Sequence, residues 1–186
     1  MKLAVLDKDG TLTKSKSGNT FVQNPTDQVL MDGVVDGCKW LLDNDYMLAI
    51  ASNQGGVEAG HKTHANAVAE VRYCMRLLEN AGVDVVNAMF CPDFNGNKCT
   101  VVGSFWSFDL ITESINGDDC VDLVGEFRKP LGGMLKAIAR KGAEKHTYTD
   151  FLMIGDREED LLAAGNAGFV FLDANKWQTT KPSLIV

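Results

Sequence analysis

The sequence lacks a long hydrophobic run. No apolar stretch in its 186 residues approaches the roughly 18 residues that a helix needs to cross a bilayer, so we expect no membrane association. A secretory leader is not visible either, because an apolar run typical of a buried strand begins at residue 2. We therefore expect the protein to work in the cytoplasm.

Cysteine and positive charge are both in short supply. The five cysteines are an odd number scattered along the chain, which favours reduced thiols over a disulfide framework. Lys and Arg total 18 against 25 Asp and Glu, which gives a formal net charge of −7. An acidic chain is a weak candidate for nucleic-acid binding, which usually needs a basic face. A local basic patch can nevertheless coexist with net negative charge.

The sequence does contain a regular alternation of apolar strands with amphipathic helices. The length and the 45% hydrophobic content suit one domain, residues 1–186, with a sizeable core. The predicted strands are 3–6, 46–51, 85–90, 149–155 and 169–172, and the predicted helices are 33–44, 61–80, 161–166 and one that starts near Pro130. Such alternation predicts an α/β fold of three layers, with a mostly parallel sheet between helices.

Three stretches are harder to interpret. Residues 13–28 are polar and predict a mobile loop over the site, where Lys14 and Lys16 either meet a phosphate or stay solvated. Residues 92–127 predict a small inserted lobe, a hairpin or irregular segment bounded by turn signals. Its aromatic residues either stack on a base or sugar or simply pack the lobe; they are Phe105, Trp106 and Phe108. The tail from Asn175 gives no prediction.

Polar side chains follow several of the predicted strands. Asp7 and Asp9 come after the first strand, Ser52 and Asn53 after the second, and Asp156 after the fourth. Because ligands of open α/β sheets bind beyond the carboxyl ends of the strands, we expect these side chains to share one site. Lys129, before a predicted helix N-terminus, is well placed for an anion.

These residue types suit phosphoryl transfer. Carboxylates at Asp7 and Asp156 can hold Mg²⁺, a hard ion that prefers oxygen ligands. Lys129 can neutralise phosphoryl oxygens and Ser52 can donate a hydrogen bond to them. Asp7 can attack phosphorus to form an aspartyl-phosphate, and Asp9 can protonate the leaving oxygen.

The joint pattern resembles the four motifs of the haloacid dehalogenase superfamily, in their usual order, over roughly residues 1–173. The matching segments are Asp7-Lys8-Asp9-Gly10-Thr11, Ser52-Asn53-Gln54, Lys129 and Gly155-Asp156. The resemblance implies a Rossmann-like fold and Mg²⁺-dependent hydrolysis of a phosphomonoester. It implies that Asp7 is the nucleophile, Asp9 the acid/base, Ser52 a phosphate donor and Lys129 the group that stabilises the intermediate. It also implies a metal held by Asp7, Asp156 and the backbone carbonyl of Asp9.

One branch of the superfamily is more similar than the rest. Asn53-Gln54-Gly55-Gly56-Val57, Arg128-Lys129-Pro130 and Gly155-Asp156-Arg157 with Asp160 look like heptose-bisphosphate and histidinol-phosphate phosphatases. That resemblance implies substrate contacts by Asn53 and Arg128, to which we add Thr11 of the first motif. The expected substrate is a small phosphorylated metabolite such as a sugar (bis)phosphate.

The zinc loop of that branch is altered here. It usually opens Cys-Pro-His, but Asp93 stands where the histidine would be, after Cys91-Pro92. Gly125-Glu126-Phe127 occupies the place of its closing cysteines. We therefore expect no structural zinc, the alternative being an unusual site made by Cys91, Cys99 and Cys120.

Two other functions stay open. Residues 16–21, with Pro25 and Asp27, resemble the loop after the first motif in polynucleotide 3′-phosphatase domains. A basic face would favour that function over a small metabolite; its candidate members are Lys14, Lys16, Lys98 and Arg128. The remaining alternative, a non-catalytic phosphate-binding module, predicts the loss of a catalytic carboxylate, and none is lost. The sequence does not indicate an oligomeric state.

Overall fold

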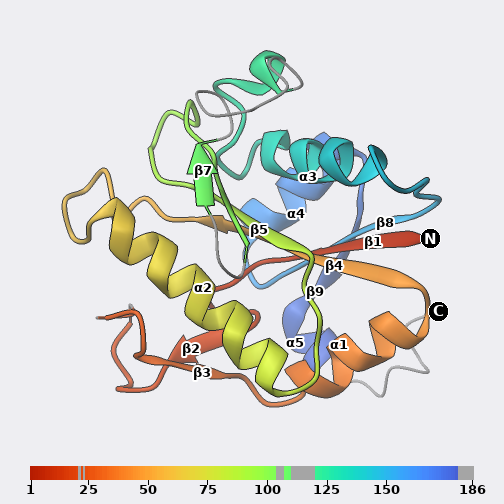
Figure 1. The fold of residues 1–186 in the computed structure, drawn as a ribbon, viewed down its shortest axis with the longest axis horizontal. Helices are drawn as coiled ribbons and strands as arrows, with labels where there is room; N and C mark the ends of the chain where they lie inside the picture. The colour runs from red at the N-terminus through yellow and green to blue at the C-terminus, as the bar shows by residue number, and fades with distance from the viewer. Residues whose placement is uncertain (21, 23, 104–106, 110–119, 180–186) are drawn as a thin grey trace.

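A seven-stranded sheet forms the centre of the molecule in the computed structural model, which describes residues 1–20, 22, 24–103, 107–109 and 120–179 (Figure 1). The strand order is β7-β6-β5-β4-β1-β8-β9. Five neighbouring strands run parallel: β5 (Asn87–Cys91), β4 (Tyr46–Asn53), β1 (Lys2–Leu6), β8 (Phe151–Gly155) and β9 (Val170–Asp173). Two short antiparallel strands, β6 (Thr100–Val102) and β7 (Ser107–Asp109), extend one edge.

Helices cover both faces of this sheet. One face carries α1 (Val34–Asp43), α2 (His64–Asn80) and α5 (Ala174–Thr179), and the other carries α3 (Gly133–Ala143) and α4 (Glu158–Ala167) (Figure 1). A single turn of 3₁₀ helix, Val121–Leu123, precedes α3. The expected α/β fold of three layers with a mostly parallel sheet is confirmed.

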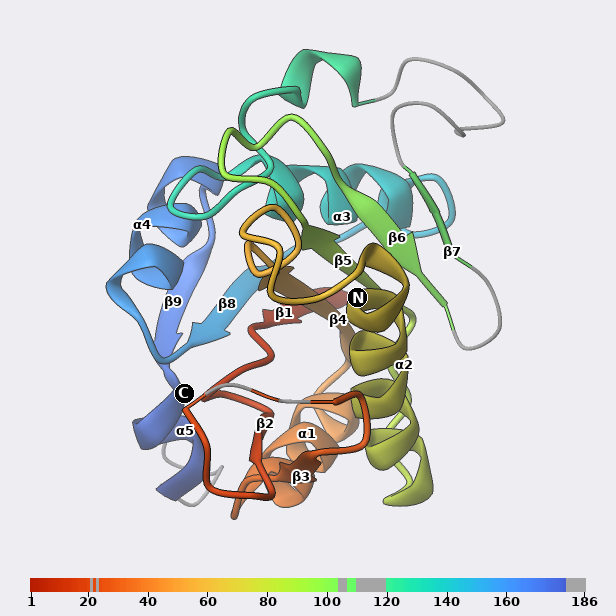
Figure 2. The same ribbon diagram turned by 90° about the vertical axis from the view of Figure 1, so that its left-hand side faces the viewer.

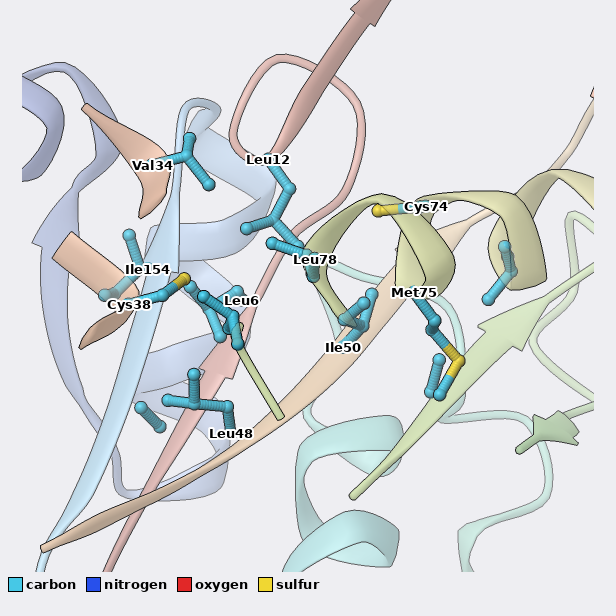
Figure 3. Close-up of a cluster of buried hydrophobic side chains, with 14 of the residues drawn as sticks. Leu6, Leu12, Val34, Cys38, Leu48, Ile50, Cys74, Met75, Leu78 and Ile154 are labelled. Atoms are coloured by element: carbon cyan, nitrogen blue, oxygen red, sulfur yellow. The ribbon is translucent and has the colours of Figure 1, made fainter. Parts of the chain in front are cut away.

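Side-chain alternation along the strands produces two cores. In β1, Ala4 and Leu6 face the cluster with α1, α2 and α5, part of which is drawn in Figure 3. Leu3 and Val5 face the cluster with α3 and α4. Successive strand residues point to opposite faces, so a strand covered on both sides must be apolar throughout. This requirement explains why the strands were recognisable as continuous apolar runs.

The described part of residues 13–28 contains secondary structure where a loop was expected. A hairpin forms from β2 (Thr13–Ser15) and β3 (Gln28–Leu30), which pair antiparallel. The loop between them is tied by the Asp27 carboxylate, which accepts hydrogen bonds from Ser15 Oγ at 3.1 Å and from Ser17 N and Oγ at 2.8 Å each. Polar hydrogen bonds rather than an apolar pattern stabilise this hairpin, so hydrophobic periodicity gave no signal.

The segment 92–127 is only partly a separate lobe. Its strands β6 and β7 do form an antiparallel pair, but β6 also pairs with β5 and so belongs to the main sheet. Phe105 and Trp106, which we considered for stacking on a base or sugar, lie outside the described residues.

Three helix starts differ from the prediction, one of them that of α4, which begins at Glu158 instead of residue 161. Helix α2 begins at His64 instead of residue 61, because Thr63 Oγ1 accepts the Asn66 N–H at 3.1 Å and caps the first turn. Helix α3 begins at Gly133, so Pro130 is not in its first turn. In the part of the chain that the structure describes, no helix is both long and apolar enough to cross a membrane. The cytoplasmic location stays a prediction.

The tail, for which the sequence gave no prediction, contains a structural helix. Trp177 in α5 is 1% exposed and packs into the core cluster with α1. A helix of 6 residues has too few positions for a clear 3.6-residue period. The buried indole therefore anchors the C-terminal part of the described chain.

We expect Trp177→Ala to lower the free energy of unfolding by about 3–5 kcal/mol, the usual cost of a large cavity. Trp40→Ala provides the control, because Trp40 is only half-buried at the edge of the same cluster. Urea unfolding of both variants measures the difference. An equal loss in the two would show that α5 is not anchored as described.

Candidate active site

The polar residues predicted from the sequence meet at the carboxyl edge of the sheet. Leu6 lies opposite Ile50 of β4 on one side and Ile154 of β8 on the other. Asp7, Ser52 and Asp156 lie at the ends of these three adjacent strands and open onto the same edge. Figure 2 looks at this edge, with the segment between β4 and α2 in front of it.

Two glycines permit the close packing at this edge. Gly10 has φ 92°, and a Cβ there would lie 2.3 Å from an Asp156 carboxylate oxygen. A Cβ on Gly155 would lie 2.3 Å from an Asp160 carboxylate oxygen. Only glycine allows such approach, so the loop after β1 can lie against the acidic residues after β8.

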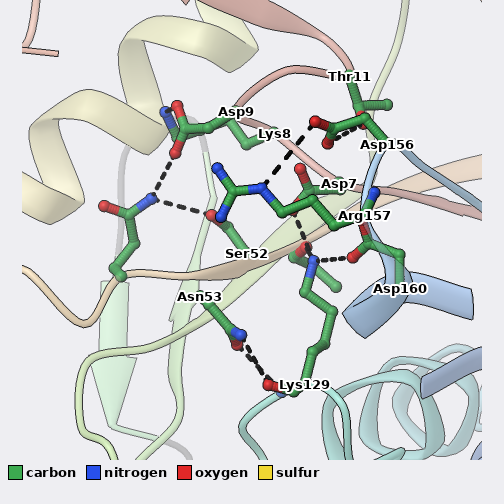
Figure 4. Close-up of polar contacts among 12 residues, drawn as sticks. Asp7, Lys8, Asp9, Thr11, Ser52, Asn53, Lys129, Asp156, Arg157 and Asp160 are labelled. Atoms are coloured by element: carbon green, nitrogen blue, oxygen red, sulfur yellow. Dashed lines mark hydrogen bonds and ion pairs between the residues drawn. The ribbon is translucent and has the colours of Figure 1, made fainter. Parts of the chain in front are cut away.

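Lys129 is the central cation of the site. Its ammonium group, on a side chain 2% exposed, donates at 2.6 Å to Asp7 Oδ1, at 2.6 Å to Asp160 Oδ1 and at 2.9 Å to the Ala51 carbonyl (Figure 4). Burial lowers the pKa of Lys129, but the two carboxylates outweigh it and raise that pKa above its usual value. The ammonium is therefore charged and fully satisfied.

The two candidate metal carboxylates both resist ionisation. Burial, only partly opposed by Lys129, raises the pKa of Asp7 to about 7. Burial also raises the pKa of Asp156, against the attraction of Arg157. Thr11 Oγ1 donates to Asp156 Oδ1 at 3.2 Å. The fully buried Thr11 thus orients a carboxylate in this structure, and its contact with substrate stays a prediction.

Asp9 is held differently from Asp7. Lys8 donates to one of its carboxylate oxygens, and Gln54 Nε2 donates to the other at 3.0 Å (Figure 4). Burial works to raise the pKa of Asp9, but Lys8 and Gln54 outweigh it and lower that pKa below its usual value. Figure 4 shows the carboxylate turned away from Asp7 and Asp156.

The remaining predicted residues surround this centre. Ser52 Oγ, which is almost fully buried, accepts from Gln54 Nε2 at 2.9 Å and keeps its own proton to donate. Asn53 binds the backbone of Lys129 on both sides, donating to its carbonyl at 2.8 Å and accepting from its N–H at 3.0 Å. Asn53 therefore positions Lys129 here, and its substrate contact stays a prediction.

Arg128 lies beside these residues with free hydrogen-bonding capacity. Its guanidinium carbon is 5.2 Å from the centroid of the Phe94 ring. Its Nη1 is buried and has no hydrogen-bond partner among the described residues. A buried N–H without an acceptor is costly, so this group is suited to donate a hydrogen bond to a ligand.

One group of side chains within the described ranges is arranged to hold a metal ion. Asp7, Asp156 and Asp160 each offer an oxygen, and these oxygens lie within 4.8 Å of one another. A set of carboxylate oxygens fits Mg²⁺. Asp160 already accepts from Lys129 and from Arg157 N at 3.2 Å, which makes it the least available of the three.

Sequence reasoning missed three contributors to this site. Lys8, Gln54 and Asp160 are buried polar residues that hold Asp9 or Lys129. The sequence did identify Asp160 by its spacing from Asp156, but it did not predict the contact of Asp160 with Lys129. The roles of Lys8 and Gln54 depend on contacts across the fold that no local pattern encodes.

Asp93 organises the loop that the resemblance to the heptose-bisphosphate branch marks as an altered zinc loop. Its carboxylate accepts from Asn97 N at 3.0 Å, Lys98 N at 3.1 Å and Cys91 Sγ at 3.2 Å. Gly96 in the same loop accepts from Gly125 N at 2.9 Å and Phe127 N at 3.1 Å. The loop thereby supports the segment that leads into Arg128 and Lys129.

We expect Asp93→Ala to destabilise the protein by about 1–3 kcal/mol, because three donors lose a charged acceptor. Asp122→Ala is the matched control: Asp122 pairs with Arg140 on the exposed surface, where an ion pair contributes little to stability. Urea unfolding of the two variants tests the difference. A smaller loss for Asp93→Ala than for the control would contradict the assigned role.

Comparison with known proteins agrees with this geometry. A family model described as polynucleotide kinase 3 phosphatase matches residues 2–175. The D-glycero-beta-D-manno-heptose-1,7-bisphosphate 7-phosphatase of Neisseria meningitidis is 28% identical over 168 residues, which cover 90% of this chain and 74% of the relative.

Solved structures show the same architecture. The D,D-heptose 1,7-bisphosphate phosphatase of B. bronchiseptica, complexed with magnesium and phosphate, matches with a TM-score of 0.63 and 27% identity, covering 92% of this chain and 79% of its own. A HAD-like protein from Mesorhizobium loti matches with a TM-score of 0.65 at 21% identity, over 91% and 69% of the two chains, and shows the fold alone.

A mostly parallel sheet covered by helices on both faces is shared with these structures. The chain is therefore an enzyme of the haloacid dehalogenase type, a phosphoric monoester hydrolase. Since the family model spans nearly the whole chain, the protein belongs to the polynucleotide kinase 3 phosphatase family.

Proposed function

We propose that this enzyme hydrolyses a small phosphorylated metabolite, such as a sugar (bis)phosphate, through an aspartyl-phosphate on Asp7 and with Mg²⁺ as cofactor. The observation that carries the proposal is the convergence of Asp7, Lys129 and Asp156 at one sheet edge. Lys129 donates to Asp7 at 2.6 Å, and Asp7 and Asp156 belong to the same potential metal group.

Each residue has a defined task in this mechanism. Asp7 attacks phosphorus, and the bond to the ester oxygen breaks while Asp9 supplies the proton that the leaving alcohol needs. Water then attacks the aspartyl-phosphate, Asp9 takes up its proton, and phosphate leaves with Asp7 restored. Ser52 and Lys129 donate to the phosphoryl oxygens throughout. Mg²⁺, held by Asp7, Asp156 and the Asp9 carbonyl, would neutralise charge on the phosphoryl group.

Asp9 must change protonation state during this cycle. In the ligand-free site, Lys8 and Gln54 keep the pKa of Asp9 low against the effect of burial. A phosphate dianion brings negative charge near this carboxylate, which raises its pKa toward the value that an acid requires. After the alcohol has left, the ionised form is the base that the second step needs.

The relatives favour a sugar bisphosphate as substrate. The curated enzyme from Neisseria meningitidis is named for a heptose 1,7-bisphosphate. Arg128, with its unpartnered buried Nη1, can bind a second anionic or hydroxylated part of such a substrate. Asn53 keeps one amide hydrogen for the same purpose.

A polynucleotide 3′-phosphatase is the second candidate, favoured by the description of the family. Two of the basic residues that would support it lie on segments far apart in the fold. Lys14 lies on β2, whereas Lys98 follows β5, and both views place these segments at opposite ends of the molecule (Figures 1 and 2). A non-catalytic module is least supported, because Asp7, Asp9 and Asp156 are all in place.

The decisive experiment is phosphate release in the presence of Mg²⁺ from two substrate sets. One set is a panel of sugar and amino-alcohol phosphates, and the other is a 3′-phosphorylated oligonucleotide. We expect higher kcat/KM on a panel member, no release after chelation with EDTA, and a loss of at least about 10³-fold in Asp7→Asn, since the nucleophile is removed.

The outcomes separate the candidates. Far higher kcat/KM on the oligonucleotide would replace the proposal by nucleic-acid end processing. Release that persists in Asp7→Asn would exclude the aspartyl-phosphate. The absence of Asp7-dependent release from both sets would favour the binding module.

We also expect Mg²⁺ binding to weaken as the pH falls. The ion needs Asp7 ionised, and the pKa of Asp7 is raised to about 7 in the metal-free protein, so below that value a proton competes with the metal. The apparent dissociation constant should rise by up to about tenfold per pH unit below pH 7 and level off above it. Calorimetric titration with Mg²⁺ between pH 6 and 8 measures this, and equal affinities across that range would contradict it.

A further inference from the structure

Both carboxylate oxygens of Asp9 are connected to the same residue of α2, Glu70, by separate chains of hydrogen bonds. In the first chain, Gln54 Nε2 donates to Asp9 Oδ2 at 3.0 Å, and Lys62 Nζ donates to Gln54 Oε1 at 3.3 Å. Lys62 Nζ also forms an ion pair with Glu70 Oε2 at 2.5 Å. This chain connects the end of β4, the segment after it and α2.

The second chain leaves Glu70 through its backbone. Gln28 Nε2 donates to the Glu70 carbonyl at 3.0 Å, and Lys8 Nζ donates to Gln28 Oε1 at 3.3 Å. Lys8 in turn donates to Asp9 Oδ1. The two chains together form a closed ring of contacts that passes through both oxygens of Asp9. Its members are Asp9, Lys8, Gln28, Glu70, Lys62 and Gln54.

The ring fixes the orientation of the Gln54 and Gln28 side-chain amides. Lys62 can only donate, so it requires the oxygen of the Gln54 amide and leaves the Gln54 NH₂ group pointing at Asp9 and Ser52. Lys8 selects the oxygen of Gln28 in the same way. Glu70, Gln28 and Gln54 are at most 3% exposed, so water does not readily replace these partners.

The ion pair of Glu70 with Lys62 lies away from the reacting atoms. The Lys62 side chain is 17% exposed and Glu70 is 2% exposed. Neither side chain belongs to the group of Asp7, Asp156 and Asp160 that can hold a metal. The direct hydrogen-bonded route from their side chains to Asp9 runs through Gln54.

We propose that Lys62 and Glu70 are positioning residues that aim the Asp9 carboxyl at the leaving oxygen. This proposal rests on the proposed function, in which Asp9 is the acid. Without the pair, the Gln54 amide can turn over and Asp9 loses a fixed donor on one oxygen. Proton transfer by Asp9 then suffers more than nucleophilic attack by Asp7, which Gln54 reaches only indirectly through Ser52.

The test compares two phosphate esters. A leaving alcohol needs a proton, but p-nitrophenolate leaves as a stable anion and depends little on the acid. The variant is the double change Lys62→Met with Glu70→Leu, which replaces both charges and avoids an unpaired buried carboxylate. The esters are p-nitrophenyl phosphate and the alkyl phosphate turned over fastest in the panel.

We expect kcat for the alkyl phosphate to fall about tenfold in the double variant, part of the ~10²–10⁴-fold that a positioned acid contributes. KM should stay unchanged, and kcat for p-nitrophenyl phosphate should change less than about twofold, because its leaving group needs little proton transfer. Lys62→Arg, which keeps a charged donor, should retain most of the alkyl phosphate rate. In an Asp9→Asn background the double variant should cause no further loss.

The matched control is Lys136→Met, which breaks an ion pair with Glu126 on an exposed part of α3 and should leave both esters unaffected. Equal losses on the two esters, or a raised KM, would show that Lys62 binds substrate or supports the fold, and would overturn the proposal while leaving the phosphatase function intact. An additive loss in the Asp9→Asn background would overturn it too. Absence of Asp7-dependent release from either ester would instead overturn the proposed function and this inference together.

Discussion

Lys129 is charged, buried and surrounded by the residues that define the site. A buried ammonium is tolerated only when it is paired and fully hydrogen-bonded, and here Asp7, Asp160 and the Ala51 carbonyl meet that condition. These partners come from the ends of β1, α4 and β4, so one cation connects three elements that are distant in the sequence. Asn53 fixes the backbone of the same lysine from both sides. The positions of Asp7, the proposed nucleophile, and of Lys129 are therefore set by one interaction.

The site distributes its polar residues between two environments. Asp7 and Asp156 lie where burial raises their pKa values. A bound metal ion would stabilise the ionised form of both carboxylates. Asp9 lies among donors that, against the effect of burial, lower its pKa. Two aspartates separated by one residue thus acquire different chemistry. Asp7 directly follows the central strand, whereas Asp9 accepts hydrogen bonds from Lys8 and Gln54.

The loop after β5 shows how the same part of a fold can be stabilised by different chemistry. The resemblance to the heptose-bisphosphate and histidinol-phosphate branch implies a zinc loop there, whereas here the Asp93 carboxylate accepts two backbone N–H groups and a thiol. Both solutions tie a short loop to the segment before Lys129. The expectation that no structural zinc is present stays a prediction, but the Asp93 contacts explain how the loop can be held without it.

Much of the fold followed from the sequence alone. The continuous apolar strands and the amphipathic helices α1 and α2 were recognisable because burial on both sheet faces and on one helix face leaves local periodic patterns. The polar residues at strand ends then predicted the site, since parallel strands bring their carboxyl ends to one edge. The hairpin β2–β3 and helix α5 were missed: the first depends on side-chain hydrogen bonds of Asp27 and Gln28, and the second is too short for a period.

By itself, the sequence predicted the class of fold, the proposed nucleophile, its paired cation and the acidic residue after β8, because Asp7 and Asp156 directly follow apolar strands and Lys129 belongs to a recognisable motif. Only the tertiary structure decided which partners these residues have. The contact of Lys129 with Asp160 joins residues 31 positions apart, that of Asn53 with Lys129 joins residues 76 apart, and that of Gln54 with Asp9 joins residues 45 apart. Hydrogen bonds of this kind are short-range and directional, so they form only once packing has brought the groups together. No local sequence pattern predicts them.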